Sequence, residues 1–296
     1  LEPNNPFYNI AIPIRIQGKL QVDVLEQSFN NILQRHEILR TTFETRDGKP
    51  IQVILSEVRL SLDIFESAEP IKELALKEAQ QAFNLDQSPL LRVKILRVSE
   101  TEHILFLTLH HIIADGWSLG ILVRELAALY QGKALEPLSL QYADFASWQR
   151  EYLQGQKLAT LLNYWKEQLH DAPSLLELPS DRPRPAIQSF RGARYKFKLS
   201  GQLTDALKTL SQKSGSTLFM VLLATFSTLL HRYTGSSDLV IGSPIANRNR
   251  SELEPLIGFF VNSLPLRINS AGNPTFEELL QRVRQVSLDA YNHQDL

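Results

Sequence analysis

The sequence contains no cysteine, and Met220 is its single methionine. Without cysteine, the chain can form neither a disulfide framework nor a thiolate metal site. Its formal net charge of -1 gives no indication of a surface for nucleic acid or anionic membranes. No apolar run reaches the roughly 18 residues that a membrane span requires, and the N-terminus lacks a signal-peptide layout. We therefore expect a cytoplasmic protein that binds neither nucleic acid nor membrane.

The composition is that of an ordinary folded protein. Hydrophobic residues make up 43% of the 296 residues and charged residues 21%, enough for one large domain or two ordinary ones. The sequence begins at Leu1, and its last residues, 292–296, follow a helical pattern without a polar tail. We expect a fragment of a longer polypeptide.

The first half of the sequence predicts a mixed α/β unit. Isoleucines alternate with other residues over 10–16, which is typical of a half-buried strand, and Pro13 indicates that this strand lies at a sheet edge or carries a bulge. Asp23 and Glu26 form a capping-box pattern that predicts a helix start, with an apolar face running to Leu39. Further elements are expected in this order: a hairpin of strands 41–45 and 50–55, a helix over 70–83, strands 90–98 and 103–112, and helices over 119–131, 142–153 and 157–169.

Four prolines between residues 171 and 185 exclude a continuous helix or central strand, which predicts a linker between two lobes. The second half predicts a strand over 193–199, a helix over 203–215, strands over 238–245 and 259–268, and a helix opened by a capping box of Thr275 and Glu278. The helix over 218–233 is apolar almost all round, so we expect it to be central. Two lobes imply a cleft where ligands often bind.

Residues 110–118 (HHIIADGWS) follow the apolar run 104–109 and precede the helical pattern. Adjacent strand side chains point to opposite faces, so His110 and His111 should have different roles. Two hydrogen-bonded structural histidines before an ordinary Asp-Gly turn are one explanation. A metal site is disfavoured because neighbouring strand histidines diverge, and a serine triad lacks the G-x-S-x-G elbow. What remains is a histidine acting as a base or hydrogen-bond partner at the lobe interface.

The HHIIADGWS stretch resembles the signature of condensation domains of nonribosomal peptide synthetases, which belong to a superfamily resembling chloramphenicol acetyltransferase. Other motifs of that family occur in order: 35–43 (RHEILRTTF), 142–148 (YADFASW), 257–267 (IGFFVNSLPLR) and 292–296 (NHQDL), the last being the start of the sixth motif. The first and seventh motifs are absent, as a fragment would explain.

The resemblance implies an α/β fold of mixed α+β sheets, in which two chloramphenicol-acetyltransferase-like lobes form a V-shaped pseudo-dimer around a tunnel. We expect an N-terminal lobe over 1–170, a linker over 171–185 and an incomplete C-terminal lobe over 186–296. The implied enzyme is an acyltransferase that forms peptide bonds. Upstream donor and downstream acceptor carrier domains would supply thioesters on phosphopantetheine arms, beside an adenylation domain in the same polypeptide. No cofactor or metal would be bound directly.

The resemblance also implies roles for individual residues. His111 is the candidate catalytic group, which orients the amine, accepts its proton or stabilises the tetrahedral species, and His110 supports it. Asp115 would be a structural anchor paired with Arg40, and Gly116 would let the backbone approach the reacting centre. Asn262, Ser263 and Trp117 are candidates for the tunnel lining. Packing explains Trp117 better, and a place in a core strand explains Asn262 and Ser263 equally well.

Several alternatives stay open. Residues 8–10, 35–43 and 117–118 are most similar to the subtype that joins two L-residues. An epimerisation domain uses the same histidine motif but continues differently after Asp-Gly, and a heterocyclisation domain would carry aspartates in place of the histidines. A stand-alone acyltransferase to alcohols would carry one histidine. A catalytically silent module that docks carrier domains would lose the second histidine, and His111 is present.

Overall fold

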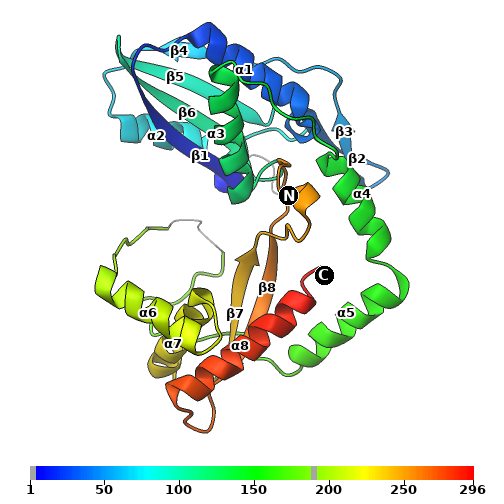
Figure 1. Cartoon of the computed structure of the whole chain (residues 1–296), viewed down its shortest axis with the longest axis vertical. Helices are drawn as coiled ribbons and strands as arrows, with labels where there is room; N and C mark the ends of the chain where they lie inside the picture. Colours follow the sequence, from blue (N-terminus) through cyan, green and yellow to red (C-terminus); the bar gives the residue numbers. More distant parts are fainter. Residues whose placement is uncertain (1–4, 188–191) are drawn as a thin grey trace. The chain divides into compact units, whose positions relative to one another are not determined.

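The computed structural model describes residues 5–187 and 192–296, and it divides into two compact units (Figure 1). Unit 1 comprises Leu1–Glu151 and Arg248–Val261, and unit 2 comprises Tyr152–Asn247 and Asn262–Leu296. The chain therefore leaves unit 1, forms most of unit 2, and returns to unit 1 before completing unit 2. This division differs from the expected one, because 152–170 join unit 2 and 248–261 join unit 1.

The core of unit 1 is a four-stranded sheet of order β1-β6-β5-β4. The strands β1 (Asn9–Gln17), β6 (Glu102–His110) and β5 (Leu91–Ser99) are antiparallel neighbours, and β4 (Asp63–Phe65) runs parallel to β5. The position of β1 at the sheet edge confirms the expectation from Pro13, since proline cannot donate a ladder hydrogen bond. Strand β6 is buried along almost its whole length, so its C-terminal end is a rigid place from which to present side chains.

Helices cover both faces of this sheet. Odd-numbered β6 residues such as Leu105 pack in a core with α1 (Val22–Arg35) and α3 (Gly116–Tyr130). Even-numbered ones such as Phe106 pack near the start of α2 (Ile71–Gln80). Because successive side chains of β6 point to opposite faces of the sheet, this one strand packs against a different helix layer on each face.

Helix α1 begins differently from the prediction. No capping box forms from Asp23 and Glu26, because Glu26 Oε2 instead accepts from Leu62 N at 2.8 Å. The helix starts at Val22 and ends at Arg35, and a 3-10 turn, η2 (Glu37–Arg40), leads into β2 (Thr41–Arg46). Strand β2 forms the expected hairpin with β3 (Lys49–Ile54). Its turn residues, Asp47 and Gly48, have φ of 51° and 72°, the left-handed values that a tight hairpin turn requires.

The returning segment of unit 1, 248–261, packs against α4 (Tyr142–Tyr152). The 3-10 turn η3 (Ser251–Leu253) lies within it. Phe145 of α4 forms a small apolar cluster with Leu253, Leu256 and Phe260. This cluster explains why the predicted strand over 259–268 begins later, at Asn262: residues 259–261 are held in unit 1 instead.

Unit 2 contains α5 (Gly155–Gln168), α6 (Gly201–Lys213), α7 (Leu218–Thr234), the antiparallel pair β7 (Asp238–Ile245) and β8 (Asn262–Asn269), and α8 (Phe276–Asn292). Trp165 of α5 packs in the same apolar core as Val221, Leu264 and Leu280, which places α5 in this unit. The capping box of Thr275 and Glu278 forms as predicted. Residues 171–185 carry no helix or strand and lie in unit 2.

Two predictions for unit 2 were wrong. The stretch 193–199 forms no strand, and Tyr195 and Phe197 are exposed; among the described residues no strand edge pairs with it. Helix α7 is not buried all round. One face is buried in the core, whereas the opposite face exposes Phe219, Leu222, Phe226, Leu229 and Tyr233.

Within the described part of the chain, no single helix has the length and apolar character to cross a membrane. Helices α6 and α7, bent by 105°, meet these criteria only as a pair, by length and composition alone.

Candidate functional site

Strand β6 ends at His110, a turn carries His111, and helix α3 begins at Gly116 with Asp115 as its N-cap. His110 is buried, with ring centroids 6.0 Å from Tyr8 and 6.2 Å from Phe83. Its Nδ1 accepts from the backbone N–H of Ile112 at 3.1 Å. Burial, followed by the charge of neighbouring His111, lowers the pKa of His110. This residue is therefore held as a neutral, packed imidazole.

His111 lies in a different environment from His110, as predicted, but the reason differs from the predicted one: strand β6 ends at His110 and His111 lies on the following turn. It is half-buried, and its ring meets that of Phe259 edge to face, with centroids 4.9 Å apart and an interplanar angle of 77°. Its Nδ1 is buried and has no hydrogen-bond partner among residues 5–187 and 192–296. Packing rather than hydrogen bonding thus surrounds this side of the imidazole.

Asp115 is fully buried and saturated with hydrogen bonds. Its Oδ1 accepts from Ser118 N at 2.8 Å and lies 2.7 Å from Ser118 Oγ. Its Oδ2 accepts from Phe260 N at 3.1 Å, and the Arg248 guanidinium lies 3.3 Å from Oδ1. In the described structure no hydrogen bond joins Asp115 to His111. The carboxylate therefore caps α3 and anchors the returning segment, and it does not orient the imidazole.

The pairing of Asp115 with Arg40 was predicted wrongly: Arg248 is the partner. Arg40 lies on η2, where its guanidinium donates to Leu55 O and lies 3.4 Å from Glu37. The Arg248 side chain is only 1% exposed and also donates to the backbone oxygens of Leu253 and Leu256. Its position 133 residues after Asp115 hides the pair from local sequence patterns. The sequence feature that could have indicated this pair is Arg248, a cationic residue shortly before the 257–267 motif.

Residues 256–260, here called the strap, are bonded through their backbone N–H and C=O groups to side chains of α4 and of residues 110–118, here called the histidine turn. Ser118 Oγ accepts from Gly258 N at 3.1 Å and lies 2.8 Å from Gly258 O. The hydroxyl of Tyr142 donates to Phe259 O at 2.9 Å. Burial, followed by the charge of Asp115, raises the pKa of Tyr142 to about 12, so the hydroxyl stays a donor.

Gly258 has a steric requirement that the sequence motif did not explain. A Cβ at this position would lie 2.2 Å from the ring of Tyr142, so only glycine fits between the strap and α4. At Gly116 a Cβ would meet no protein atom within 4 Å. The predicted role of Gly116 toward the reacting centre therefore stays a prediction.

Trp117 is 47% exposed, and its indole N–H donates to Glu254 O at 3.0 Å. It borders an open hollow of about 530 Å³ beside Gly120, Arg124 and Pro255. Asn262 and Ser263 begin β8 in unit 2, where the Asn262 amide donates to the backbone oxygens of Gln294 and Leu296. The tunnel roles of Trp117, Asn262 and Ser263 stay predictions.

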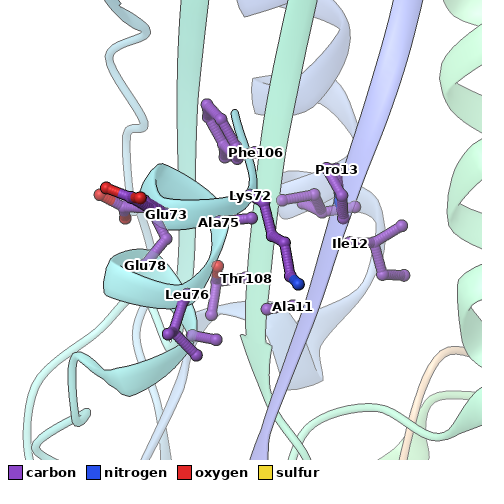
Figure 2. Close-up of a pocket in the computed structure, with 12 residues that line it drawn as sticks. Ala11, Ile12, Pro13, Lys72, Glu73, Ala75, Leu76, Glu78, Phe106 and Thr108 are labelled. Atoms are coloured by element: carbon purple, nitrogen blue, oxygen red, sulfur yellow. The ribbon is translucent and has the colours of Figure 1, made fainter. Parts of the chain in front are cut away.

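A second hollow, of about 440 Å³, lies on the α2 face of the unit 1 sheet. Figure 2 shows Lys72 and Leu76 of α2 beside Phe106 and Thr108 of β6. Its lining includes no residue of the histidine turn. In the described part of the chain no group of three or more histidine or acidic side chains could hold a metal ion.

Sequence comparisons relate the whole chain to known proteins. The profile of the family described as "Condensation domain" matches residues 1–296. A linear gramicidin synthase polypeptide of Brevibacillus parabrevis is 48% identical over 310 residues, which cover 100% of this chain and 4% of that protein. Phosphinothricin tripeptide synthetase of Streptomyces viridochromogenes is 41% identical, with 100% and 28% covered. The chain thus spans a small part of these relatives.

Solved structures share the fold. The X-domain in its complex with OxyB from teicoplanin biosynthesis is 31% identical, with a TM-score of 0.89 and coverage of 98% of this chain and 66% of that one. The first condensation domain of the calcium-dependent antibiotic synthetase, in complex with a substrate analogue, is 21% identical with a TM-score of 0.82, covering 99% and 72%. The latter similarity concerns the fold alone.

Proposed function

The chain belongs to the condensation-domain family of nonribosomal peptide synthetases, and from this premise we propose that it joins two carrier-bound substrates through an amide bond. The amine of an acceptor aminoacyl thioester attacks the carbonyl carbon of a donor acyl or peptidyl thioester. The new C–N bond forms, the C–S bond breaks, and the amine proton ends on the released thiol. The observation that carries the proposal is the half-buried His111 imidazole at the end of a buried strand.

His111 would contact the attacking amine. Its Nδ1 is buried, which leaves Nε2 to meet the substrate. Histidine suits proton transfer near neutral pH, and a positioned general base contributes typically about 10²–10⁴-fold. An amine is already nucleophilic and a thioester is already activated. Holding the two reacting atoms in attack geometry would therefore supply much of the remaining acceleration.

Asp115 would act at a distance from the chemistry. All its described partners belong to the fold: Ser118, Phe260 and Arg248. We assign it the maintenance of the turn that presents His111, and we assign His110 the packing behind it.

The partners follow from the same premise. Upstream donor and downstream acceptor carrier domains would bring their substrates on phosphopantetheine arms, which are cargo of those domains. An adenylation domain would adjoin in the same polypeptide, consistent with relatives far longer than this chain. Residues 8–10, 35–43 and 117–118 favour the subtype that joins two L-residues.

The test compares His111→Ala with the parent synthetase, using loaded donor and acceptor carriers and mass spectrometry of the acceptor arm. We expect dipeptidyl product to fall by about 10²–10⁴-fold. The matched control is His170→Ala, since the His170 side chain is 77% exposed in unit 2 and its loss should leave product formation unchanged.

An undiminished product in His111→Ala would overturn the assigned role. Chiral analysis of the same arm separates the alternatives. Inversion of the carrier-bound residue without a new amide would identify an epimerisation domain, and neither reaction in the parent would identify a silent docking module.

A further inference from the structure

We propose that Phe259 is a positioning residue for His111, whose ring fixes the plane of the imidazole for the attack step. The inference rests on the proposed role of His111. The strap would thus influence the reaction through the contact between the Phe259 ring and the His111 imidazole.

The first argument concerns the His111 ring nitrogen that lies away from the substrate. Histidines that transfer protons are normally held by a hydrogen bond at the ring nitrogen away from the substrate. In residues 5–187 and 192–296, Nδ1 of His111 is buried with no such partner. The Phe259 ring, at 4.9 Å between centroids and 77° between planes, makes the edge-to-face contact that aromatic pairs prefer. Packing therefore does what a hydrogen bond usually does.

The second argument is that the backbone of Phe259 is fixed on both sides. Gly258 is bonded through both its N–H and its carbonyl to Ser118, the carbonyl of Phe259 accepts from Tyr142, and the N–H of Phe260 donates to Asp115. Three consecutive residues are thus tied to unit 1. A side chain on such a backbone has little freedom beyond its own rotamers.

The third argument is the contrast between Phe259 and its neighbour. Phe260 is 2% exposed and packs in the apolar cluster of α4, so it accounts for the attachment of the strap. Phe259 is 40% exposed and contributes to none of the buried core clusters. The described aromatic contact of its ring is with His111. The position of this ring is therefore explained by the imidazole beside it.

The experiment measures the rate of amide formation in the intact synthetase as a function of acceptor-carrier concentration. For Phe259→Ala we expect the saturated rate to fall by about tenfold, while the half-saturating carrier concentration stays within about twofold, because the loss concerns orientation after binding. Phe259→Tyr retains the ring and should restore the rate to within about twofold. Phe276→Ala removes an equally exposed phenylalanine, 40%, from α8 of unit 2 and should leave the rate unchanged.

A second readout follows the imidazole itself. Carbethoxylation of His111 by diethyl pyrocarbonate, mapped by peptide mass spectrometry, should be faster in Phe259→Ala than in the parent or in Phe259→Tyr, because the imidazole then lacks its aromatic neighbour. Phe259→Leu serves in place of the alanine variant if thermal denaturation shows the latter to be unfolded.

Three results would overturn the inference: a parental rate in Phe259→Ala, an equal loss in Phe259→Tyr, or a loss confined to the half-saturating concentration, which would mean that Phe259 contacts substrate. Each is distinguishable from failure of the proposed function. That failure appears as full activity of His111→Ala, whatever Phe259 does.

Discussion

Unit 1 and unit 2 bury different kinds of polar groups. In unit 1 the buried residues include His36, His110, Asp115 and Glu125, and the Arg248 side chain is almost inaccessible. In unit 2 the described buried polar residues are serines; three of them, Ser211, Ser227 and Ser287, bond to carbonyls of their own helices. Burying charge is expensive unless every group is paired, whereas a serine bonded within its helix needs no partner elsewhere. Buried charge in this molecule is therefore concentrated in the unit that presents the proposed site.

The units also differ in how they cover apolar surface. Sheet residues of unit 1 meet helices on both faces, whereas α7 of unit 2 exposes a row of large apolar side chains opposite its core face. A contiguous exposed apolar face of this kind is unusual on a monomeric protein. Unit 1 should thus be sensitive to the loss of a buried charge, whereas the exposed face of α7 in unit 2 should tolerate substitution.

The largest effect should come from Asp115→Ala. Its removal leaves the Arg248 guanidinium buried without its carboxylate, so the free energy of unfolding of unit 1 should fall by about 3–5 kcal/mol. Urea denaturation measures this loss. Arg40→Ala is the control, since Arg40 is bonded to Leu55 and Glu37, and its removal should cost about 1 kcal/mol. Equal losses of unfolding free energy in Asp115→Ala and Arg40→Ala would contradict the assignment of Arg248, rather than Arg40, as the partner of Asp115.

A smaller effect concerns His110 and pH. Because burial lowers the pKa of His110, the unfolded chain binds this proton more readily than the folded one. The contribution of neutral His110 to the free energy of unfolding of unit 1 should therefore be complete above the pKa of the unfolded chain, about 6.5. It should decline as the pH falls toward the pKa of His110 in the folded protein. Urea denaturation at a series of pH values checks this. His110→Gln should flatten the decline, and an unchanged slope would contradict the assignment.

The smallest effect should come from Phe226→Ser on the exposed face of α7. Because this side chain is 47% exposed, the substitution should change the free energy of unfolding of the 296-residue chain by less than about 0.5 kcal/mol while lowering the fluorescence of a bound hydrophobic dye. Leu230→Ser, on the buried face, should cost several times more. A large loss from Phe226→Ser would mean that the face is covered.

Features set by neighbours in the sequence were predictable. The hairpin turn at Asp47 and Gly48, the capping box at Thr275 and the turn between β6 and α3 all depend on residues within a few positions of one another. The different environments of His110 and His111 were predicted from strand alternation, although the structure ends the strand at His110 and places His111 on the turn.

Features that depend on distant partners were not predictable. Glu26 had an alternative partner at Leu62, and residues 193–199 alternate like a strand but have no described edge to pair with. Arg248 and the strap reach Asp115 and Ser118 across more than 100 positions. Hydrophobic periodicity carries no information about which distant residue a given side chain will contact in the folded protein.

The discontinuity of unit 1 has a consequence for its biosynthesis. Arg248 follows Asp115 by 133 residues, so at about 5–20 residues per second the ribosome needs roughly 7–27 s to supply the partner of a carboxylate that it has already made. Until then the turn that carries His111 lacks the strap, and unit 1 cannot mature on the nascent chain ahead of most of unit 2. For the same reason no single crossover point transfers unit 1 between synthetases: residues 248–261 have to move together with residues 1–151.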